Sequence, residues 1–166
     1  MHVAKLAHAP RYLQRDHCRW PILSPALFSW RATPLQVRMT SPCPFCSLPA
    51  DRQLLANDRA IAIRDGFPVS PGHTLIVPRR HIDSFFEVTD EERSDLIQLL
   101  MQARHDLERE FSPAGYNVGI NDGPAAGQTV PHLHIHLIPR YAGDREDPRG
   151  GVRWVLPGKA DYWSKE

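Results

Sequence analysis

Cysteine is scarce in this chain, with only Cys18, Cys43 and Cys46 among 166 residues. Three unevenly spaced cysteines are too few for a disulfide scaffold, so we expect a reducing, cytoplasmic setting. No apolar run reaches the roughly 18 residues that a transmembrane helix requires. The N-terminus also lacks the compact apolar block of a secretory signal. The sequence therefore predicts a protein that neither spans a membrane nor enters the secretory route.

The chain also has no large excess of positive or negative charge. The 20 basic and 19 acidic residues leave a net charge of +1 with neutral histidines. Such a balance argues against a dedicated nucleic-acid or membrane-surface binder. Apolar residues make up 42% of the chain and charged residues 23%, which are ordinary values for a globular protein. We therefore expect one compact domain with a hydrophobic core.

The first 38 residues differ from the rest. Residues 1–38 hold six Lys/Arg and one acidic residue, a net +5 that leaves −4 on residues 39–166. They contain four prolines and show no sustained period of 2 or 3.6. We interpret them as a basic, disordered extension or as a stretch upstream of a true start at Met39. A transit peptide is a third reading, disfavoured because residues 20–30 form no Arg-rich amphipathic helix. The domain is then 39–166.

Short apolar runs bounded by turn residues, with alternation in 60–64 and in the histidine run, predict several short strands. They are 54–56, 60–64, 73–78, 115–120 and 132–138. Because these segments do not alternate with helices as βαβ units, an antiparallel arrangement is favoured over a parallel one.

One long helix is predicted over about 90–110. Thr89 and Glu92 form a capping box at its start. An apolar stripe at three- and four-residue spacing follows, consisting of Leu96, Leu99, Leu100, Ala103 and Leu107. A short helical piece is predicted over 81–86. The fold class is therefore α+β, a twisted antiparallel sheet with one long and one short helix.

Three histidines stand at alternate positions, His132, His134 and His136, with Leu133 and Ile135 between them. On a strand, residues i, i+2 and i+4 share a face, so three imidazoles would line one surface while the apolar residues enter a core. Three readings compete: solvated histidines, a metal site, and nucleophilic catalysis. Neutral imidazole is a good nucleophile towards phosphorus near pH 7.

The pair Cys43 and Cys46 forms a CxxC motif with several readings. A redox pair is possible, but the expected βαβ context is missing. Two buried thiols are the simplest alternative. A zinc site needs two more ligands, and His81 and His132 are available.

Taken together, these motifs resemble the histidine triad family of nucleotide hydrolases and transferases. The resemblance covers roughly 43–145 and is greatest to the branch of fragile-histidine-triad dinucleoside polyphosphate hydrolases. It rests on residues 71–78, His81, the loop 122–131 and the run 132–140. The family fold that it implies agrees with the antiparallel α+β sheet expected from the pattern.

The resemblance also implies roles for individual residues. His134 would attack the α-phosphorus of a nucleotide, and His136 would contact the phosphate and hold charge. His132 would be structural or a metal ligand. The expected nucleotide-binding residues are Asp65 on the ribose hydroxyls and Asn121, Gln128 and Thr129 on phosphate oxygens. His73 is expected to have a packing or hydrogen-bonding role.

The zinc-containing relatives imply a structural zinc site made of Cys43, Cys46, His81 and His132. Magnesium would accompany a polyphosphate substrate. Family members pair through a helix and an adjacent strand, so a homodimer is expected.

The resemblance favours the hydrolysis of dinucleoside polyphosphates through a nucleotidyl-histidine intermediate, with a purine nucleotide as the preferred substrate. Pro131 and the loop 122–127 favour this branch. Purine nucleoside phosphoramidase activity is the alternative within the family. A nucleotide-binding protein without catalytic activity and a zinc-redox module are alternatives from other classes.

Overall fold

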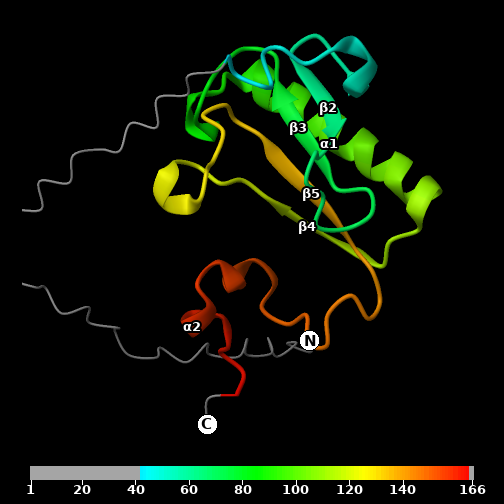
Figure 1. Ribbon diagram of the computed structural model, residues 1–166, viewed down its shortest axis with the longest axis vertical. Helices are drawn as coiled ribbons and strands as arrows, with labels where there is room; N and C mark the ends of the chain where they lie inside the picture. The colour runs from blue at the N-terminus through cyan, green and yellow to red at the C-terminus, as the bar shows by residue number, and fades with distance from the viewer. Residues whose placement is uncertain (1–41, 165–166) are drawn as a thin grey trace, which may run out of the picture. The chain divides into compact units, whose positions relative to one another are not determined.

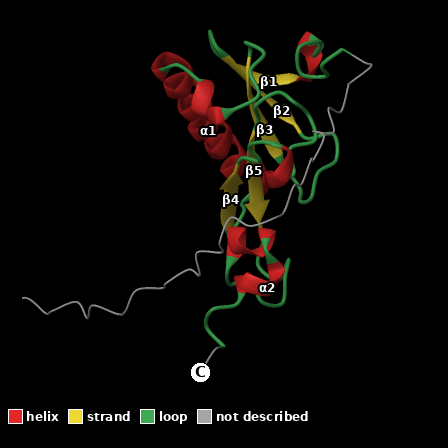
Figure 2. Cartoon of the chain, turned by 90° about the vertical axis from the view of Figure 1, so that its left-hand side faces the viewer, coloured by secondary structure: helices red, strands yellow, loops and turns green. Residues whose placement is uncertain are grey.

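The computed structural model describes residues 42–164. Within these residues, five strands form one antiparallel sheet in the order β1-β2-β3-β5-β4, and α1 lies along one face of it (Figures 1 and 2). The strands are β1 Gln53–Ala56, β2 Ala60–Arg64, β3 Thr74–Pro78, β4 Gly115–Gly119 and β5 Ile135–Arg140. The helices are α1 Asp90–Phe111 and α2 Pro157–Ala160. Short 3₁₀ turns are η1 Ala50–Arg52, η2 Phe85–Glu87, η3 Pro124–Ala126 and η4 Gly151–Val155.

The capping box predicted for the long helix is present in α1. The Thr89 side chain accepts a hydrogen bond from the Glu92 N–H, and the Glu92 carboxylate accepts one from the Thr89 N–H. Arg80 donates two hydrogen bonds of 2.7 Å to the same carboxylate. At the other end, Ser112 takes a left-handed conformation with φ 48°, which stops the helix. The predicted bounds of about 90–110 are therefore confirmed to within a residue.

The two faces of the sheet carry different cores. Leu96, Leu99, Ala103 and Leu107 of α1 are buried against one face, so the predicted apolar stripe is core. The opposite face carries a second apolar cluster, formed by Ile61, Ile63, Leu75 and Val77 with Phe45 and Leu48 packed on it. Leu75 pairs with His136 across β3 and β5, and paired residues point the same way. His136 therefore lies on the face that α1 does not cover.

The histidine run differs from the prediction of one continuous strand. β5 begins at Ile135, so only His136 lies in the ladder. Further pairing would bring Pro78 opposite this stretch, and proline has no N–H to donate. The Leu133 N–H instead donates to the Ile82 carbonyl at 2.6 Å. His132 and His134 thus lie in extended backbone just before the strand.

The short helix was also placed inaccurately. Of the predicted piece 81–86, only Phe85–Glu87 forms a 3₁₀ turn, which Ser84 caps by accepting from the Phe86 N–H. A second short helix, Pro157–Ala160, lies near the C-terminus, where the sequence predicted none. The interpretation of residues 1–38, and of Met39 as a start, falls outside residues 42–164. Of the helices in that described part, none has the length and apolar character needed to cross a membrane.

Candidate functional site

His134 is held in one tautomer by the backbone. Its Nδ1 lies 2.8 Å from the carbonyl oxygen of His132, and an imidazole N–H is the only donor of that pair. The proton of the neutral ring is therefore on Nδ1, and Nε2 keeps its lone pair. Phe45 packs edge-on against this ring at 5.2 Å between centroids, and His136 at 4.9 Å. The side chain is 7% exposed, so it is fixed in place but reachable from one side.

His132 turns away from His134 towards the two cysteines. Its Nε2 donates to the Pro78 carbonyl at 2.9 Å, which leaves the lone pair on Nδ1. That Nδ1 lies 3.3 Å from Sγ of Cys43 and 3.5 Å from Sγ of Cys46. Nδ1 of His81 lies 3.2 Å from Sγ of Cys46.

These four ligand atoms, two sulfurs and two nitrogens, all lie within 4.8 Å of one another. In a tetrahedral zinc site, sulfur and nitrogen ligands are about 3.6 Å apart. The measured separations and the donor set of Cys43, Cys46, His81 and His132 therefore fit zinc. The structure brings together all four residues that the sequence predicted for this site.

His136 belongs to a second group of polar side chains, with Asp65 and His73. Nε2 of His73 lies 3.1 Å from Nδ1 of His136, and Nδ1 of His73 lies 3.3 Å from an Asp65 carboxylate oxygen. The Val69 N–H donates to the same Nδ1 of His73 at 3.4 Å, so the neutral ring carries its proton on Nε2 and donates to Nδ1 of His136. The packing or hydrogen-bonding role expected for His73 thus takes a specific form, because it connects Asp65 to the triad.

Burial sets the charge state of this group. It lowers the pKa of His136 to about 4, and the neighbouring His134 and His73 add to the effect. Burial also lowers the pKa of His73, although Asp65 acts in the opposite direction. Both rings are therefore neutral near pH 7. A phosphate placed beside His136 would favour its protonated form and raise its pKa again.

A cavity of about 480 Å³ opens beside His136, between β4 and η4. His73, Asn121 and His136 line one part of it, and Val152 and Trp154 of η4 line another. The ring of His134 lies 4.9 Å from that of His136 between centroids, but His134 itself does not line the cavity. The volume is within the range of small-molecule sites.

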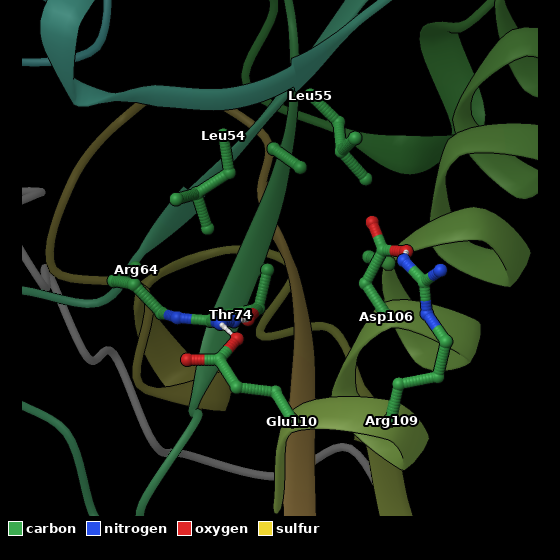
Figure 3. A pocket seen from close by; sticks show the side chains of 9 residues that line it. Leu54, Leu55, Arg64, Thr74, Asp106, Arg109 and Glu110 are labelled. Carbon is green, nitrogen blue, oxygen red and sulfur yellow. Dashed lines mark hydrogen bonds and ion pairs between the residues drawn. The ribbon is translucent and has the colours of Figure 1, made fainter.

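Another cavity, of about 460 Å³, lies on the α1 side of the sheet (Figure 3). Leu54 and Leu55 line it on one side, and α1 side chains on the other. Its charged groups pair with each other: Arg64 donates to Glu110 and to the Thr74 hydroxyl, each at 2.7 Å. No triad histidine lines it, so the cavity beside His136 is the candidate site.

The predicted phosphate-binding residues lie in different situations. Asn121 lines the cavity beside His136. Gln128 uses its amide within the loop: the oxygen accepts from the Gly123 N–H and the NH₂ donates to the Asp83 carbonyl, both at 2.8 Å. Thr129 is exposed. The second N–H of the Gln128 amide is not used by these two bonds and remains a donor for a phosphate, and all three roles stay predictions.

Residues 50–143, more than half of the chain, match the family model of the HIT domain. The chain belongs to the histidine triad (HIT) family. The family comprises nucleotide hydrolases and transferases. The five-stranded antiparallel sheet with one long helix confirms the predicted α+β fold class.

Known relatives agree with this assignment. The chain is 42% identical over 77 residues to the asymmetrical bis(5'-nucleosyl)-tetraphosphatase of Schizosaccharomyces pombe, which covers 46% of this HIT protein and 42% of the relative. It thus spans less than half of that enzyme. The crystal structure of a HIT family protein from Bacillus subtilis superposes with a TM-score of 0.58 at 33% identity, covering 63% of this chain and 77% of that one. A zinc-bound HIT family protein from Mycobacterium smegmatis gives 0.56 at 28% identity, covering 71% and 93%.

Several residues of the site were not found from the sequence. Asp122 accepts from the Ser84 hydroxyl and the Phe85 N–H, and so ties the loop before the triad to η2. Val152 and Trp154 line the cavity from a segment without any periodic pattern. No local signal could have identified them, because they reach the site only through the path of the chain after β5.

Proposed function

We propose that this HIT protein hydrolyses dinucleoside polyphosphates through a nucleotide covalently bound to His134. The proposal rests on one observation, the hydrogen bond from Nδ1 of His134 to the His132 carbonyl. Because this bond holds the proton of the neutral ring on Nδ1, the lone pair on Nε2 is available to attack phosphorus without a separate base. The similarity to a bis(5'-nucleosyl)-tetraphosphatase supports this class of substrate.

The reaction takes two steps that balance. In the first, the Nε2 lone pair of His134 forms a bond to the α-phosphorus, and the bond from phosphorus to the bridging oxygen breaks. The electron pair leaves with that oxygen on the departing nucleotide. In the second, water attacks the phosphorus, the P–N bond breaks and its electron pair returns to Nε2. A nucleoside monophosphate and a proton are released.

The other triad and loop residues act on the substrate. His136 contacts the phosphate and, once protonated there, offsets its negative charge. Asn121, Gln128 and Thr129 donate hydrogen bonds to phosphate oxygens. Asp65 accepts from the ribose hydroxyls, and magnesium accompanies the polyphosphate. The apolar cluster around Phe45 offers a surface for a purine base without fixing which one.

Zinc would be held by Cys43, Cys46, His81 and His132, and it would serve as a structural cross-link. Four protein ligands close the coordination sphere, so the metal would not meet the substrate. Its effect would be to fix His132, whose carbonyl orients His134.

Metal content tests the zinc site directly. We expect about one zinc per chain in the purified protein, and loss of it in Cys46→Ser. A matched control is Ser47→Ala, an exposed neighbour in the same turn. A metal-free wild type with both thiols freely titratable would contradict the site.

We also propose a homodimer formed through α1 and the edge strand β4. Met101 and Ile97 on α1 and Val118 on β4 are large apolar side chains left exposed. Arg104, one turn after Met101, lies over the Tyr116 ring of β4, so the two elements border each other here. Val118→Asp should convert the dimer to a monomer in sedimentation analysis, and a monomeric wild type would contradict the proposal.

The catalytic proposal is tested with a panel of substrates that share a transferred adenylate. Diadenosine tri- and tetraphosphate, adenosine 5'-phosphoramidate and adenosine monophosphate are incubated with the protein, and the products are identified. We expect the dinucleotides to give adenosine monophosphate, with an adenylate adduct on His134 found by mass spectrometry after acid-free quenching. Preference for the phosphoramidate would assign phosphoramidase activity instead. Binding of the monophosphate without turnover of any substrate would indicate a non-catalytic nucleotide-binding protein.

A further inference from the structure

We infer that the cavity between β4 and η4 receives the leaving half of the substrate, and that η4 selects leaving groups with an aromatic nucleoside. This inference rests on the proposed nucleotidyl transfer to His134. It adds a specificity surface, formed by Gly151–Val155, that the triad motif does not contain.

The cavity is lined by one of the triad histidines. Of the lining residues, His136 contacts the proposed nucleophile, because its ring lies 4.9 Å from that of His134. Two apolar surfaces therefore flank the triad. The Phe45 cluster lies against His134 on one side, and the cavity opens beside His136 on the other. A dinucleoside substrate has two bases, and each surface has room for one of them.

The side chains that line the cavity indicate which kind of group it would bind. Seven apolar side chains dominate it, namely Val69, Val118, Ile120, Ile138, Val152, Trp154 and Val155. Within residues 42–164, no Asp, Glu, Lys or Arg lines the cavity. An anionic leaving group such as inorganic phosphate or sulfate finds no charged partner there. A nucleoside base has a flat, weakly polar surface that suits these side chains, while its phosphates stay at His136 and Asn121.

The segment Gly151–Val155 forms the η4 side of the cavity, which we call the wall, and contacts within the C-terminal segment hold it in place. The Trp154 indole N–H donates to the Arg149 carbonyl at 2.7 Å, and the Arg145 guanidinium lies 4.1 Å from the centre of the Trp154 ring. Gly150 has φ +88°, and a Cβ added there would lie 3.1 Å from Trp163 and 3.2 Å from Trp154. This segment is therefore a packed turn, and Trp154 reaches the cavity in a fixed orientation.

Two side chains of the wall have no visible structural reason to be apolar. Val152 is 60% exposed and Val155 78% exposed, and both line the cavity. Exposed apolar groups gathered at a cavity commonly mark a binding surface. The wall also lies beyond the matched HIT domain, which ends at residue 143. Its specificity would therefore be a property of this chain's C-terminal segment.

The test compares two substrates that transfer the same adenylate: diadenosine triphosphate, with a nucleoside in its leaving group, and adenosine 5'-phosphoramidate, which releases only ammonia. The variant is Val152→Ser combined with Val155→Ser. We expect the ratio of kcat/KM for the dinucleotide to kcat/KM for the phosphoramidate to fall about tenfold, the scale for lost apolar contacts in a pocket. The ratio does not depend on the fraction of folded enzyme.

Leu156→Ser is the matched control, since Leu156 is 65% exposed and follows the wall without lining the cavity. It should leave both rates as in the wild type. An unchanged ratio in the double variant, or an equal fall with both substrates, would overturn the inference while the catalytic proposal stands. A wild type that cleaves neither substrate would overturn the catalytic proposal, and the inference with it.

Discussion

Each histidine of the triad makes a different hydrogen bond, and these bonds distinguish three identical side chains. His132 donates to the Pro78 carbonyl and offers Nδ1 to the cysteines. His134 donates to the His132 carbonyl and keeps Nε2 free. His136 faces His73. Because a neutral imidazole has one donor and one acceptor, the partner of one nitrogen decides what the other can do.

Replacement of the proposed nucleophile should separate chemistry from binding. In His134→Ala, kcat should fall by about 10⁴-fold or more, because no other group forms the covalent intermediate. Affinity for adenosine monophosphate should change little, since the phosphate and ribose contacts remain. Single-turnover kinetics and calorimetric titration measure the two quantities. The control is His105→Ala, an exposed histidine on α1, and retained turnover in His134→Ala would reassign the nucleophile.

The lowered pKa of His136 predicts a pH dependence of stability. Its pKa is about 4 in the folded protein, against an ordinary value of 6.5. As the pH falls from about 7 to about 5, the unfolded chain takes up a proton that the folded site does not, so the free energy of unfolding decreases. His136→Gln lacks this contribution and should lose less stability over the same interval.

Urea denaturation at the two pH values measures this difference. His73 and His132 also have lowered pKa values, so the variant keeps part of the slope. A decline identical to that of the wild type would show that His136 titrates alike in both states.

At the scale of elements, the turn 42–48 and helix α1 lie on opposite faces of the sheet and affect the site in different ways. The turn brings Cys43 and Cys46 to His132 and places Phe45 against His134. Helix α1 buries its apolar stripe on the other face and makes no contact with the triad through it. The helix should therefore affect stability, and the turn should affect activity as well.

The capping box of α1 gives a test of this division. Thr89→Ala removes the side-chain acceptor of the Glu92 N–H and should lower the free energy of unfolding by about 1 kcal/mol. Thr89→Ser keeps a hydroxyl acceptor and should recover most of the loss. Turnover per folded molecule should stay at the wild-type level in both. A large fall in kcat of Thr89→Ala would show that α1 is coupled to the triad.

At the scale of the whole molecule, the matched HIT domain covers residues 50–143 and leaves both ends of the chain outside it. The zinc ligands Cys43 and Cys46 precede that range, and η4 follows it. Segments before and after the matched range, which the family model does not include, therefore contribute residues to the candidate site. The triad lies in the common domain, whereas two of the four zinc ligands and the proposed leaving-group surface lie outside it.

Removal of residues 1–38 tests the domain boundary predicted from composition. The shortened chain beginning at Met39 should fold and should keep the kcat/KM of the full chain, because the sheet, α1 and the triad all lie within 42–164. Thermal unfolding and turnover of diadenosine triphosphate are the two measurements. A chain that aggregates or loses activity would show that the basic segment contributes to the domain.

Much of the fold was predictable from local signals. Short apolar runs marked β2 and β3, which are buried on both faces, and the capping box with its apolar stripe marked α1, which buries one face. The resemblance named the four zinc ligands, which the structure brings together, and the triad, of which His134 and His136 are in contact. The start of β5 was missed, because it depends on Pro78 of another strand.

The sequence by itself determined which elements form and which residue types carry the chemistry, since periodicity, caps and the His-x-His-x-His spacing act over a few residues. The tertiary structure decided what His132 and His136 do. Their partners are Pro78, Cys43 and His73, far away along the chain, whereas His134 donates to a carbonyl only two residues before it. The tertiary structure also decided that η4 meets β4 beside His136. Contacts between distant parts of the chain set these partners and the lining of the cavity, and no local pattern encodes them.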